Sequence, residues 1–389
     1  MTIGIDRIGM ATPGFYLDLV ELAQARGDEP DKYTIGIGQD QQAVAPSSQD
    51  IVTMGAQAAA EILTAEDREQ IGLIALGTET GIDSSKAAAL YIQQLLGVTE
   101  WARTIELKEA CYGGTAALMM ARDYVAAHPD KRALVIAADI ARYGLASGGE
   151  VTQGAGAVAM IVSSEPRLLA LADDSVYRSQ SIMDFWRPVY TDLALAKGKY
   201  STEQYLDFFQ QVWHQYQTAT GRQIADFKAL CFHLPYTKMG MKALKLVLPT
   251  ATEAQQATLL HRFDASIQYS RRIGNLYTGS LYLGLLSLLE LDDSLRAGDR
   301  LGLFSYGSGA VGEFFSATLV AGFEKQLHPA LHRQLLDARK RLSVAEYERV
   351  FEDKVPYSAA DYPADPAYFA GDFVLTGVQA QERQYQKRG

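Results

Sequence analysis

Residues 103–138 read RTIELKEACYGGTAALMMARDYVAAHPDKRALVIAA, and this stretch decides the fold. Residues 103–107 are typical of a strand, the apolar run 112–121 is typical of a helix, and residues 133–138 return as a strand of small aliphatic side chains. The sequence therefore predicts a strand, a helix and a second strand, with Cys111 at the point where the first strand gives way to the helix.

The segment before this stretch follows the same alternating plan. Residues 71–76 form an apolar run with β-branched members, which indicates a buried strand with Glu79 just beyond its carboxyl end. Residues 87–96 indicate a helix that Gly97 terminates, and residues 83–85, Asp-Ser-Ser, are candidates to cap its start.

The second half of the chain repeats this arrangement. Residues 229–232 indicate a strand that ends at His233, and a helix is expected from Met239 onward. Further along, Asn275 precedes residues 278–289, an apolar run typical of a buried helix. Each half thus offers one polar residue at a strand end and another just before a helix.

This repetition predicts how the halves are assembled. Glu79 and His233 occupy matching places, and so do Cys111 and Asn275, so we expect two α/β halves whose sheets share a central layer of helices, with one site between them. Residues after about Glu324 are charged, and we expect an appended helix followed by a loosely ordered tail without a chemical role.

Composition and charge exclude several classes of protein. The chain has 389 residues, 48% of them hydrophobic and 21% charged, with a net charge of -10 and two cysteines. No stretch gathers Lys and Arg densely enough for nucleic acid, and no apolar run approaches the roughly 20 residues that a membrane span needs. The start shows no secretory signal, so we expect a cytoplasmic protein without a disulfide framework.

Cys111 is the strongest candidate for a nucleophile. A cysteine at the start of a helix lies near unpaired N–H groups and the positive end of the helix dipole, which favour the thiolate. Gly113 and Gly114 each cost about 0.8–1 kcal/mol relative to Ala inside a helix, so we expect them to admit a ligand close to the backbone. A buried core residue is the alternative for a lone cysteine, and Cys231 fits that description better.

Two further titratable residues follow predicted strands. Glu79 lies among small residues, where burial can raise the pKa of its carboxyl toward that of a general base; a solvated loop carboxylate is the alternative. His233 lies in the half opposite the cysteine, where it can polarise a reacting carbonyl or protonate a leaving thiolate; a structural core histidine is the alternative.

Patterns for a metal or a nucleotide are absent from the sequence. His328 and His332 are four residues apart, but no third ligand is near and an exposed helix end explains them. Residues 153–157, QGAGA, lack the G-x-G-x-x-G spacing, and no G-x-x-x-x-G-K-[ST] motif occurs. We therefore expect no metal site and no dinucleotide or P-loop nucleotide.

Six motifs occur in a characteristic order along the chain. They are Gly36-Ile37-Gly38-Gln39, Gly77-Thr78-Glu79-Thr80, Glu109-Ala110-Cys111-Tyr112-Gly113-Gly114, Gly148-Gly149-Glu150, Phe232-His233-Leu234-Pro235 and Ser305-Tyr306-Gly307-Ser308-Gly309. Together they resemble the hydroxymethylglutaryl-CoA synthase family in its compact bacterial form, from the first strand to about residue 320. Ala138 and Arg142 depart from the family pattern, where Ser and Lys are expected, and neither touches the predicted chemistry.

The resemblance implies an α/β, thiolase-like duplicated αβαβα layered fold, with two five-stranded mixed sheets and an appended C-terminal helical segment. It divides the chain into an N-terminal half, residues 1–166, which holds the cysteine and the glutamate, and a C-terminal half, residues 167–389, which holds His233 and Asn275 and ends in an extension from about residue 324. It also implies a homodimer, and the apolar runs of the first half suit a buried sheet edge.

The reaction implied by the resemblance is the condensation of acetyl-CoA with acetoacetyl-CoA and water. It gives 3-hydroxy-3-methylglutaryl-CoA and CoA for the mevalonate pathway of isoprenoid biosynthesis, without a dissociable cofactor. On the matching positions, Cys111 takes the acetyl group, Glu79 removes a proton from its methyl, and His233 polarises the acetoacetyl carbonyl. The other positions that match substrate contacts are Tyr143, Thr152, Ser201, Asn275 and Ser308, with Lys238 and Lys242 as candidate partners of the CoA phosphates.

Four alternatives share parts of this pattern. A ketoacyl-synthase III-like enzyme also uses Cys, His and Asn in this order, but its decarboxylation needs no base, so Glu79 argues against it. A thiolase needs a second active-site cysteine, and none follows Cys231. The intact set of Glu79, Cys111 and His233 disfavours a non-catalytic acyl-CoA-binding protein. An enzyme that acts on acyl groups tethered to a carrier protein stays open, because its condensation site would be the same.

Overall fold

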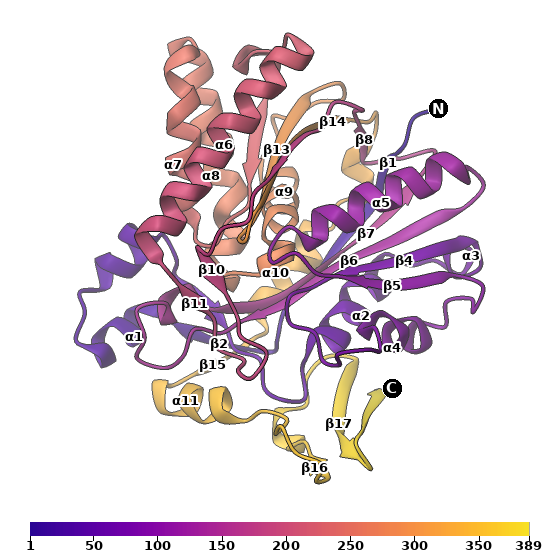
Figure 1. The fold of residues 1–389 in the computed structure, drawn as a ribbon, viewed down its shortest axis with the longest axis vertical. Coiled ribbons are helices and arrows are strands. Elements are labelled where there is room, and N and C mark those ends of the chain that lie inside the picture. Colours follow the sequence, from indigo (N-terminus) through magenta and orange to yellow (C-terminus); the bar gives the residue numbers. More distant parts are fainter. Residues whose placement is uncertain (389) are drawn as a thin grey trace.

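A ten-stranded mixed sheet runs through the molecule in the computed structural model, which describes residues 1–388 (Figure 1). Its strands are β1 (Gly4–Ala11), β4 (Ile71–Gly77), β5 (Arg103–Leu107), β6 (Arg132–Ala141), β7 (Gly154–Ser163), β8 (Leu169–Leu171), β9 (Val176–Ser179), β12 (Ala229–Phe232), β13 (Arg300–Gly307) and β14 (Val311–Leu319). They are hydrogen-bonded in the order β12-β13-β14-β8-β1-β7-β6-β4-β5, and β9 pairs with β14.

The prediction of two five-stranded sheets is wrong, because the strands of both halves form one sheet. The first half supplies β1, β4, β5, β6 and β7, and the second half supplies the other five strands. The short strand β8 pairs with β1 through Ile5 and Leu169 and with β14 through Leu171 and Ala317, so the hydrogen bonding continues from one half into the other. The sheet is therefore continuous, although each half contributes five strands.

Helices cover both faces of the sheet in each half. They are α2 (Ile51–Ile62), α3 (Ala65–Gln70), α4 (Ala88–Leu96) and α5 (Gly113–Ala127) in the first half, and α6 (Gly198–Thr220), α7 (Thr237–Val247), α8 (Glu253–Ile273) and α9 (Ser280–Leu291) in the second. On β6, the side chain of Ala137 faces Gly114 of α5, whereas its neighbours Ile136 and Ala138 face Gly55 of α2. This alternation follows from the pleat of a strand, and it places α2 and α5 on opposite faces.

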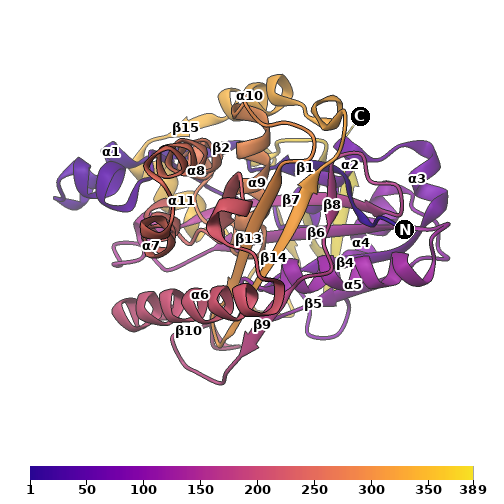
Figure 2. The ribbon, with the colours of Figure 1, turned by 90° about the horizontal axis from the view of Figure 1, so that it is seen from above.

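The predicted central layer of helices consists of α5 and α9. The helix α5 packs on β4, β6 and β7, while α9 packs on β1, β12 and β13. Ser280 to Leu289 are all buried, as expected for a helix that is apolar all round, and the hydroxyls of Thr115 and Tyr282 join the two helices at 2.7 Å. On the outer side of the second half, α6 packs against β9, β13 and β14 (Figure 2).

The helix α4 is not capped by residues 83–85, contrary to the prediction from the sequence. The residue before the helix is Ala87, which makes no side-chain cap. Asp83 instead accepts hydrogen bonds from the backbone N–H groups of Ser85 and Lys86, which closes a turn ahead of the helix. The carboxylate of Glu106 on β5 accepts from the N–H of Ala88 at 2.8 Å, so the cap comes from a neighbouring strand.

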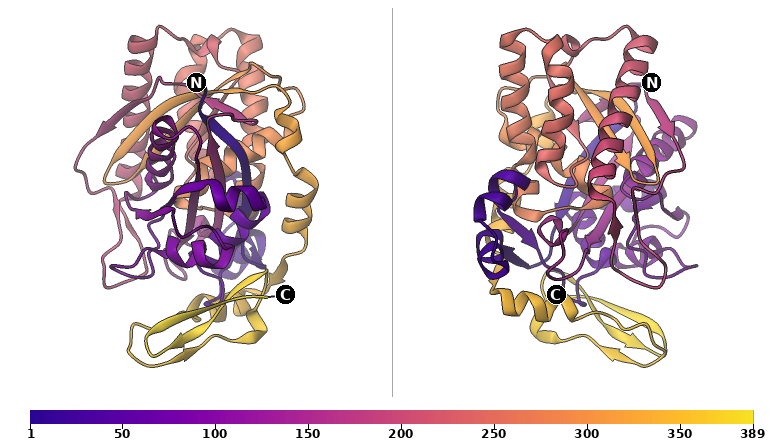
Figure 3. Two further views of the ribbon diagram at one scale, coloured as in Figure 1. Left: turned by 90° about the vertical axis from the view of Figure 1, so that its right-hand side faces the viewer. Right: turned by 60° about the vertical axis from the view of Figure 1, so that its left-hand side comes forward.

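The expectation of a loosely ordered tail is wrong. After α10 (Pro329–Asp337), the strand β15 (Lys340–Leu342) pairs in parallel with β2 (Phe15–Asp18), which also pairs with β3 (Gln41–Ala43). The helix α11 (Val344–Glu352) and the strands β16 (Tyr362–Pro363), β17 (Phe373–Gln379) and β18 (Glu382–Lys387) follow (Figure 3). Phe373 is buried in the main core and Tyr385 donates to Asp50, so apolar anchors among the charged residues fix this extension.

His332 is buried, which corrects the prediction of an exposed helix end. Its Nε2 lies 3.0 Å from Glu61 Oε1, and its Nδ1 lies 2.9 Å from Glu290 Oε1. Burial opposes the charge, but the adjacent carboxylates of Glu290 and Glu61 raise the pKa of His332 to about 9. His328 is exposed as expected, and no cluster of three metal-ligating side chains occurs among residues 1–388.

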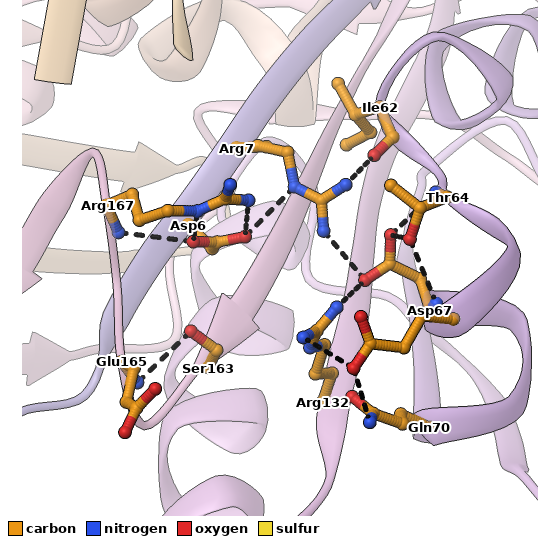
Figure 4. Close-up of polar contacts among 11 residues, drawn as sticks. Asp6, Arg7, Ile62, Thr64, Asp67, Gln70, Arg132, Ser163, Glu165 and Arg167 are labelled. Atoms are coloured by element: carbon orange, nitrogen blue, oxygen red, sulfur yellow. Dashed lines mark hydrogen bonds and ion pairs between the residues drawn. The ribbon is translucent and has the colours of Figure 1, made fainter. Parts of the chain in front are cut away.

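A second buried set of charges ties α3 to the sheet (Figure 4). Asp67 accepts hydrogen bonds from Arg7 of β1, from Arg132 of β6 and from the N-cap residue Thr64. Burial raises the pKa of Asp67, but these hydrogen bonds outweigh it and hold the pKa well below its usual range. The neighbouring Asp6 is paired with Arg7 and with Arg167 in the segment that leads to β8.

Two further expectations concern membranes and disulfides. None of the helices within residues 1–388 is both long and apolar enough to cross a membrane. Cys111 and Cys231 are both free thiols, and Cys231 lies in β12 as a buried core residue.

Candidate active site

Cys111 and Glu79 are in direct contact. The Sγ atom of Cys111 lies 3.2 Å from Oε1 of Glu79, and the thiol donates to the carboxylate. They meet because β4 and β5 are adjacent parallel strands, so the residues after their carboxyl ends emerge at the same edge of the sheet. A Cβ atom at Gly77 would lie 2.4 Å from the N atom of Gly114, so only glycine allows the end of β4 this close to α5.

The glycines at the start of α5 admit backbone rather than the predicted ligand. A Cβ atom at Gly114 would lie 2.6 Å from the carbonyl oxygen of Thr278, which belongs to the second half. A Cβ atom at Gly113 would lie 3.2 Å from the carbonyl oxygen of Leu107 and 3.3 Å from the methyl group of Thr278. The two halves therefore pack tightly at these glycines, directly behind Cys111.

Asp139 of β6 fixes the loop that carries Glu79. Its Oδ1 atom accepts hydrogen bonds from the hydroxyls of Thr78 and Thr80, at 2.9 and 2.7 Å, and from the N–H of Glu79 at 2.9 Å. Its Oδ2 atom accepts from the N–H of Thr278 at 3.1 Å and from the hydroxyl of the same residue. One buried carboxylate therefore holds parts of both halves.

Arg187 is the second partner of Glu79. It lies between β10 (Phe185–Trp186) and β11 (Leu195–Ala196), two short strands that pair with each other. Its Nη2 atom donates to the backbone oxygen of Glu79 at 2.7 Å and to Oε2 of the same residue at 3.2 Å. The two carboxylate oxygens of Glu79 thus have different partners, the thiol on one and the guanidinium on the other.

The electrostatics of the pair correct the predicted thiolate. Burial and the adjacent charge of Asp139 raise the pKa of Glu79 to about 8, against the lowering influence of Arg187. Burial and the charge of Glu79 raise the pKa of Cys111 well above its ordinary value. Burial, and the carboxylate of Glu79 beside the sulfur, therefore favour the thiol over the predicted thiolate in the resting protein.

His233 follows β12 and is held through its backbone. Its N–H donates to the carbonyl of Phe304 on β13 at 2.8 Å, and its own carbonyl accepts from the hydroxyl of Tyr205 at 2.8 Å. Burial lowers the pKa of His233 to about 3, so the imidazole is neutral at physiological pH. A neutral ring keeps one N–H donor and one acceptor.

The strand β13 links the His233 end of the site with the cysteine turn. Phe304 accepts from the N–H of His233, and three residues later a Cβ atom at Gly307 would lie 2.6 Å from the N atom of Tyr112. Ser308 follows in the turn between β13 and β14. Only glycine lets this turn lie against the backbone beside Cys111.

Asn275 has a free donor in the site. Its Oδ1 atom accepts from the N–H of Tyr277 at 2.8 Å and from the hydroxyl of Ser280 at 3.0 Å. Its Nδ2 atom is buried and has no hydrogen-bond partner among the described residues. Tyr143 packs with Tyr277 and Cys111 in one apolar cluster, and Asn275 is among the groups that affect the pKa of the Tyr143 phenol, so the expected contacts Tyr143 and Asn275 are neighbours.

Asp184 organises the far side of the site. It accepts hydrogen bonds from the hydroxyl of Tyr306 at 2.9 Å, from the N–H of Gly309 at 3.0 Å and from the hydroxyl of Ser201 at 3.3 Å. Ser308 lies between two of these partners in the chain. The expected substrate contacts Ser201 and Ser308 are thereby placed on neighbouring elements.

The remaining expected contacts are Thr152, Lys238 and Lys242. The hydroxyl of Thr152 donates to the carbonyl of Gly149 at 2.8 Å. Lys242 is exposed on α7 and donates to the hydroxyl of Tyr236 at 3.2 Å, and Lys238 is half-exposed one turn earlier. Among the described residues, none of the three makes a hydrogen bond to the cysteine, the glutamate or the histidine.

Sequence reasoning missed Asp139, Asp184 and Arg187 as residues of the site. Asp139 carried a usable signal, because an acidic residue in a strand of small aliphatic side chains is costly to bury unless it is hydrogen-bonded. Asp184 and Arg187 carried none, since they lie in a segment without a periodic pattern.

Both halves of the chain match models of one protein family. The model described as hydroxymethylglutaryl-coenzyme A synthase N terminal matches residues 1–166, and the model described as hydroxymethylglutaryl-coenzyme A synthase C terminal matches residues 247–388. The second match continues past residue 320, where the resemblance of the motifs was expected to end.

Individual relatives agree with these matches. A hydroxymethylglutaryl-CoA synthase of Enterococcus faecalis is 56% identical over 91% of this chain and 92% of its own. PksG of Bacillus subtilis, a polyketide biosynthesis 3-hydroxy-3-methylglutaryl-ACP synthase, is 32% identical over 90% of this chain and 88% of its own. A crystal structure of an HMG-CoA synthase complexed with CoA superposes with a TM-score of 0.97 over 100% of both chains, at 45% identity.

Proposed function

Because the chain belongs to the hydroxymethylglutaryl-CoA synthase family, we propose that Cys111 carries an acetyl group from acetyl-CoA and that this group condenses with acetoacetyl-CoA. The chain is an acyl-CoA condensing enzyme, and 3-hydroxy-3-methylglutaryl-CoA is its product, for the mevalonate pathway. The observation that carries the assignment of residues is the 3.2 Å contact between Cys111 Sγ and Glu79 Oε1.

Acetylation is the first step. The sulfur of Cys111 attacks the thioester carbonyl of acetyl-CoA, the bond from that carbonyl to the CoA sulfur breaks, and the thiol proton ends on the departing CoA. The buried Nδ2 of Asn275 and the backbone N–H groups near Cys111 and Ser308 are the donors that we assign to the developing oxyanion. Glu79 then loses its hydrogen-bond donor, because the acetylated sulfur carries no proton.

Carbon–carbon bond formation is the second step. Oε1 of Glu79 faces the sulfur that now carries the acetyl group, so this carboxylate is the base that removes a methyl proton. The resulting enolate attacks the acetoacetyl carbonyl, which a neutral His233 polarises by hydrogen bonding through its N–H. The proton that Glu79 removed from the methyl group ends on the new alkoxide oxygen, which becomes the 3-hydroxyl group and leaves Glu79 ionised again. Water finally hydrolyses the enzyme thioester, which releases the product and restores the thiol.

We propose the same substrate contacts that the motifs indicate. We assign Tyr143, Thr152, Ser201, Asn275 and Ser308 to the acyl groups and pantetheine, and Lys238 and Lys242 to the CoA phosphates. Both lysines lie on α7, one turn apart, so one helix face offers two cations to a diphosphate. Cys111, Glu79 and His233 together account for acetylation, proton removal and polarisation of the carbonyl. We therefore assign the CoA thioesters as substrates and no dissociable cofactor.

Mass spectrometry of the intact protein and of its Cys111 peptide tests this function. Incubation with acetyl-CoA should add one acetyl group to Cys111, and acetoacetyl-CoA should then discharge it with release of CoA. The Cys111→Ala variant is the control and should not be acetylated. Absence of acetylation on the native protein would refute the proposal.

A carrier-protein substrate is the second candidate, because the Bacillus subtilis relative is named as an ACP synthase. The higher identity to the Enterococcus faecalis enzyme favours CoA substrates for this chain. Competing acetyl-CoA against acetyl-ACP at equal concentration distinguishes the two, and preferential acetylation of Cys111 by acetyl-ACP would reverse the assignment.

We also assign a homodimer, the two halves 1–166 and 167–389, and a cytoplasmic location. The strand β5 is the last strand of the sheet, and the adjacent Trp101 is 95% exposed, so a second copy at this edge would cover both. Two free cysteines suit a reducing compartment. Light scattering of the purified protein tests the dimer, and a monomeric mass would exclude it.

A further inference from the structure

We propose that Arg187 is a positioning residue for the catalytic base: it holds Glu79 so that one carboxylate oxygen stays directed at the sulfur of Cys111. This inference rests on the proposed function, because it assigns a role within the same condensation.

The geometry of the contact supports this role. One nitrogen, Nη2, binds both the backbone oxygen of Glu79 at 2.7 Å and its Oε2 at 3.2 Å. A donor that bridges a residue's own backbone and side chain fixes the side-chain rotamer relative to the strand end. Oε1 is then left to face Cys111, at 3.2 Å from its sulfur.

Arg187 is itself held in place. The side chains of Arg187 and Glu79 are 12% and 7% exposed, so solvent screens their charges little. The guanidinium lies 5.7 Å from the ring centroid of Tyr277, and the nearby Phe185 packs edge-on against the same ring. Asp184, three residues before Arg187, anchors the segment through Tyr306 and Gly309.

Arg187 also separates the base from open space. A cleft of about 600 Å³ lies between the C-terminal extension and the first half, and Thr80, Arg142 and Arg187 line it. Because Arg187 covers Oε2 of Glu79 from this side, it limits the access of water to the carboxylate. A hydrated carboxylate would be a weaker base toward a methyl proton.

The charges around Glu79 give Arg187 a second effect. The titratable groups that face Glu79 are the thiol of Cys111, the carboxylate of Asp139, the phenols of Tyr143 and Tyr277, and the Arg187 guanidinium. Arg187 is the cation of this set and lowers the pKa of Glu79, whereas burial and Asp139 raise it. Loss of Arg187 should therefore keep Glu79 protonated to higher pH.

The test compares Arg187→Met and Arg187→Lys with Arg178→Met, in which an arginine outside the site loses the same charge. Three quantities are measured: the rate of Cys111 acetylation, the rate of deuterium uptake into the acetyl methyl of the acetyl-enzyme in D₂O, and kcat and KM for acetoacetyl-CoA against pH. The deuterium uptake reports proton removal without the second substrate.

For Arg187→Met we expect deuterium uptake and kcat to fall by about 10²-fold at pH 7. KM should change by less than about threefold, since Arg187 is assigned no substrate contact. The rising limb of the kcat profile should move up by about 1–2 pH units, and Arg187→Lys should restore part of both effects. Arg178→Met should behave as the native protein.

Other results overturn the inference. If the rising limb of the pH profile of kcat in Arg187→Met lies at the native pH, Arg187 does not act through Glu79. Equal losses of Cys111 acetylation and deuterium uptake would likewise show that Arg187 acts on folding or binding instead. If Arg187→Met fails to fold, Arg187→Lys must still show the shifted limb, and a native profile for it rejects the inference. Native protein that is acetylated but does not condense refutes the proposed function itself, separately from Arg187.

Discussion

At the residue scale, the surroundings of Glu79 and Cys111 favour the thiol form of the cysteine in the resting protein. Both groups have raised pKa values because they are buried beside further negative charge, so the proton stays on the sulfur until a thioester arrives. The same carboxylate that disfavours the thiolate lies 3.2 Å from the sulfur to which we assign the acetyl group. In the proposed mechanism, Glu79 therefore restrains the nucleophile before acetylation and acts as the base after it.

Replacing Glu79 should separate the two chemical steps. In Glu79→Ala the charge that raises the pKa of Cys111 is gone, so we expect acetylation to persist within about tenfold of the native rate. Condensation should fall by at least about 10³-fold, because the methyl proton has no acceptor. Mass spectrometry follows the first step and CoA release the second, and near-normal condensation would contradict the base assignment.

The pH dependence of condensation follows from the same residue. Glu79 must be ionised to accept a proton, and its pKa is raised to about 8, so activity should be low at pH 6 and rise through pH 8. The measurement is kcat of pre-acetylated enzyme between pH 6 and pH 9.5. A flat profile over this range, which a glutamate with the ordinary pKa of 4.5 would give, would contradict the assignment of a buried Glu79 as the base.

At the element scale, the elements that carry the site follow from the sequence. The apolar runs 71–76 and 133–138 are β4 and β6, the run after Cys111 is α5, and the repeated pattern of the second half is β12, α7 and α9. Hydrophobic periodicity identifies these elements because each must bury one or both faces. The cap of α4 was not predicted, because the capping residue Glu106 lies on a strand that follows the helix. The residues next to the helix start therefore do not indicate this contact.

The C-terminal extension could not be predicted for a related reason. Its few apolar residues are separated by charged residues. Their role in packing is visible only once the surface of the main core that they contact is known. Arg187 belongs to the same class, because an arginine in a segment without periodicity gives no sign that it contacts a strand end more than 100 residues away. Residues placed by long-range contacts are those that the sequence pattern misses.

The hairpin β17–β18 offers a test of how firmly this extension is attached. Phe373 is buried in the main core, so Phe373→Ala should lower the free energy of unfolding by about 3–5 kcal/mol. Tyr357→Ala is the matched control, since Tyr357 is 80% exposed in the same extension, and it should change stability by less than about 0.5 kcal/mol. Urea unfolding measures both, and equal small effects would mean that the hairpin contributes little to the fold.

At the scale of the whole molecule, the site exists only where the two halves meet. Of the proposed site residues, the first half supplies Cys111 and Glu79, and the second supplies His233 and Asn275. Asp139 joins them by binding Thr278, and Gly113 and Gly114 let the two halves pack so closely that a larger side chain there would push them apart. The duplicated plan predicted this meeting of strand ends, but the tightness comes from backbone contacts that only the structure reveals.

His332 joins the halves a second time, away from the site. It lies on α10 between Glu61 of α2, in the first half, and Glu290 of α9, in the second, and its side chain is fully buried. Because the folded state raises the pKa of His332 from 6.5 to about 9, the charged histidine stabilises the fold. This contribution is complete below about pH 6.5 and is lost as the pH rises through about 9.

The variant His332→Gln tests this link between the halves. The shift in pKa corresponds to about 3 kcal/mol, so the native protein should exceed the variant in unfolding free energy by about that amount at pH 6 and by much less at pH 9.5. His328→Gln, an exposed histidine on the same segment, is the control and should match the native protein at both pH values. Urea unfolding at the two pH values gives the comparison. A difference that does not depend on pH would mean that His332 stabilises the halves by packing alone, with its charge playing no part.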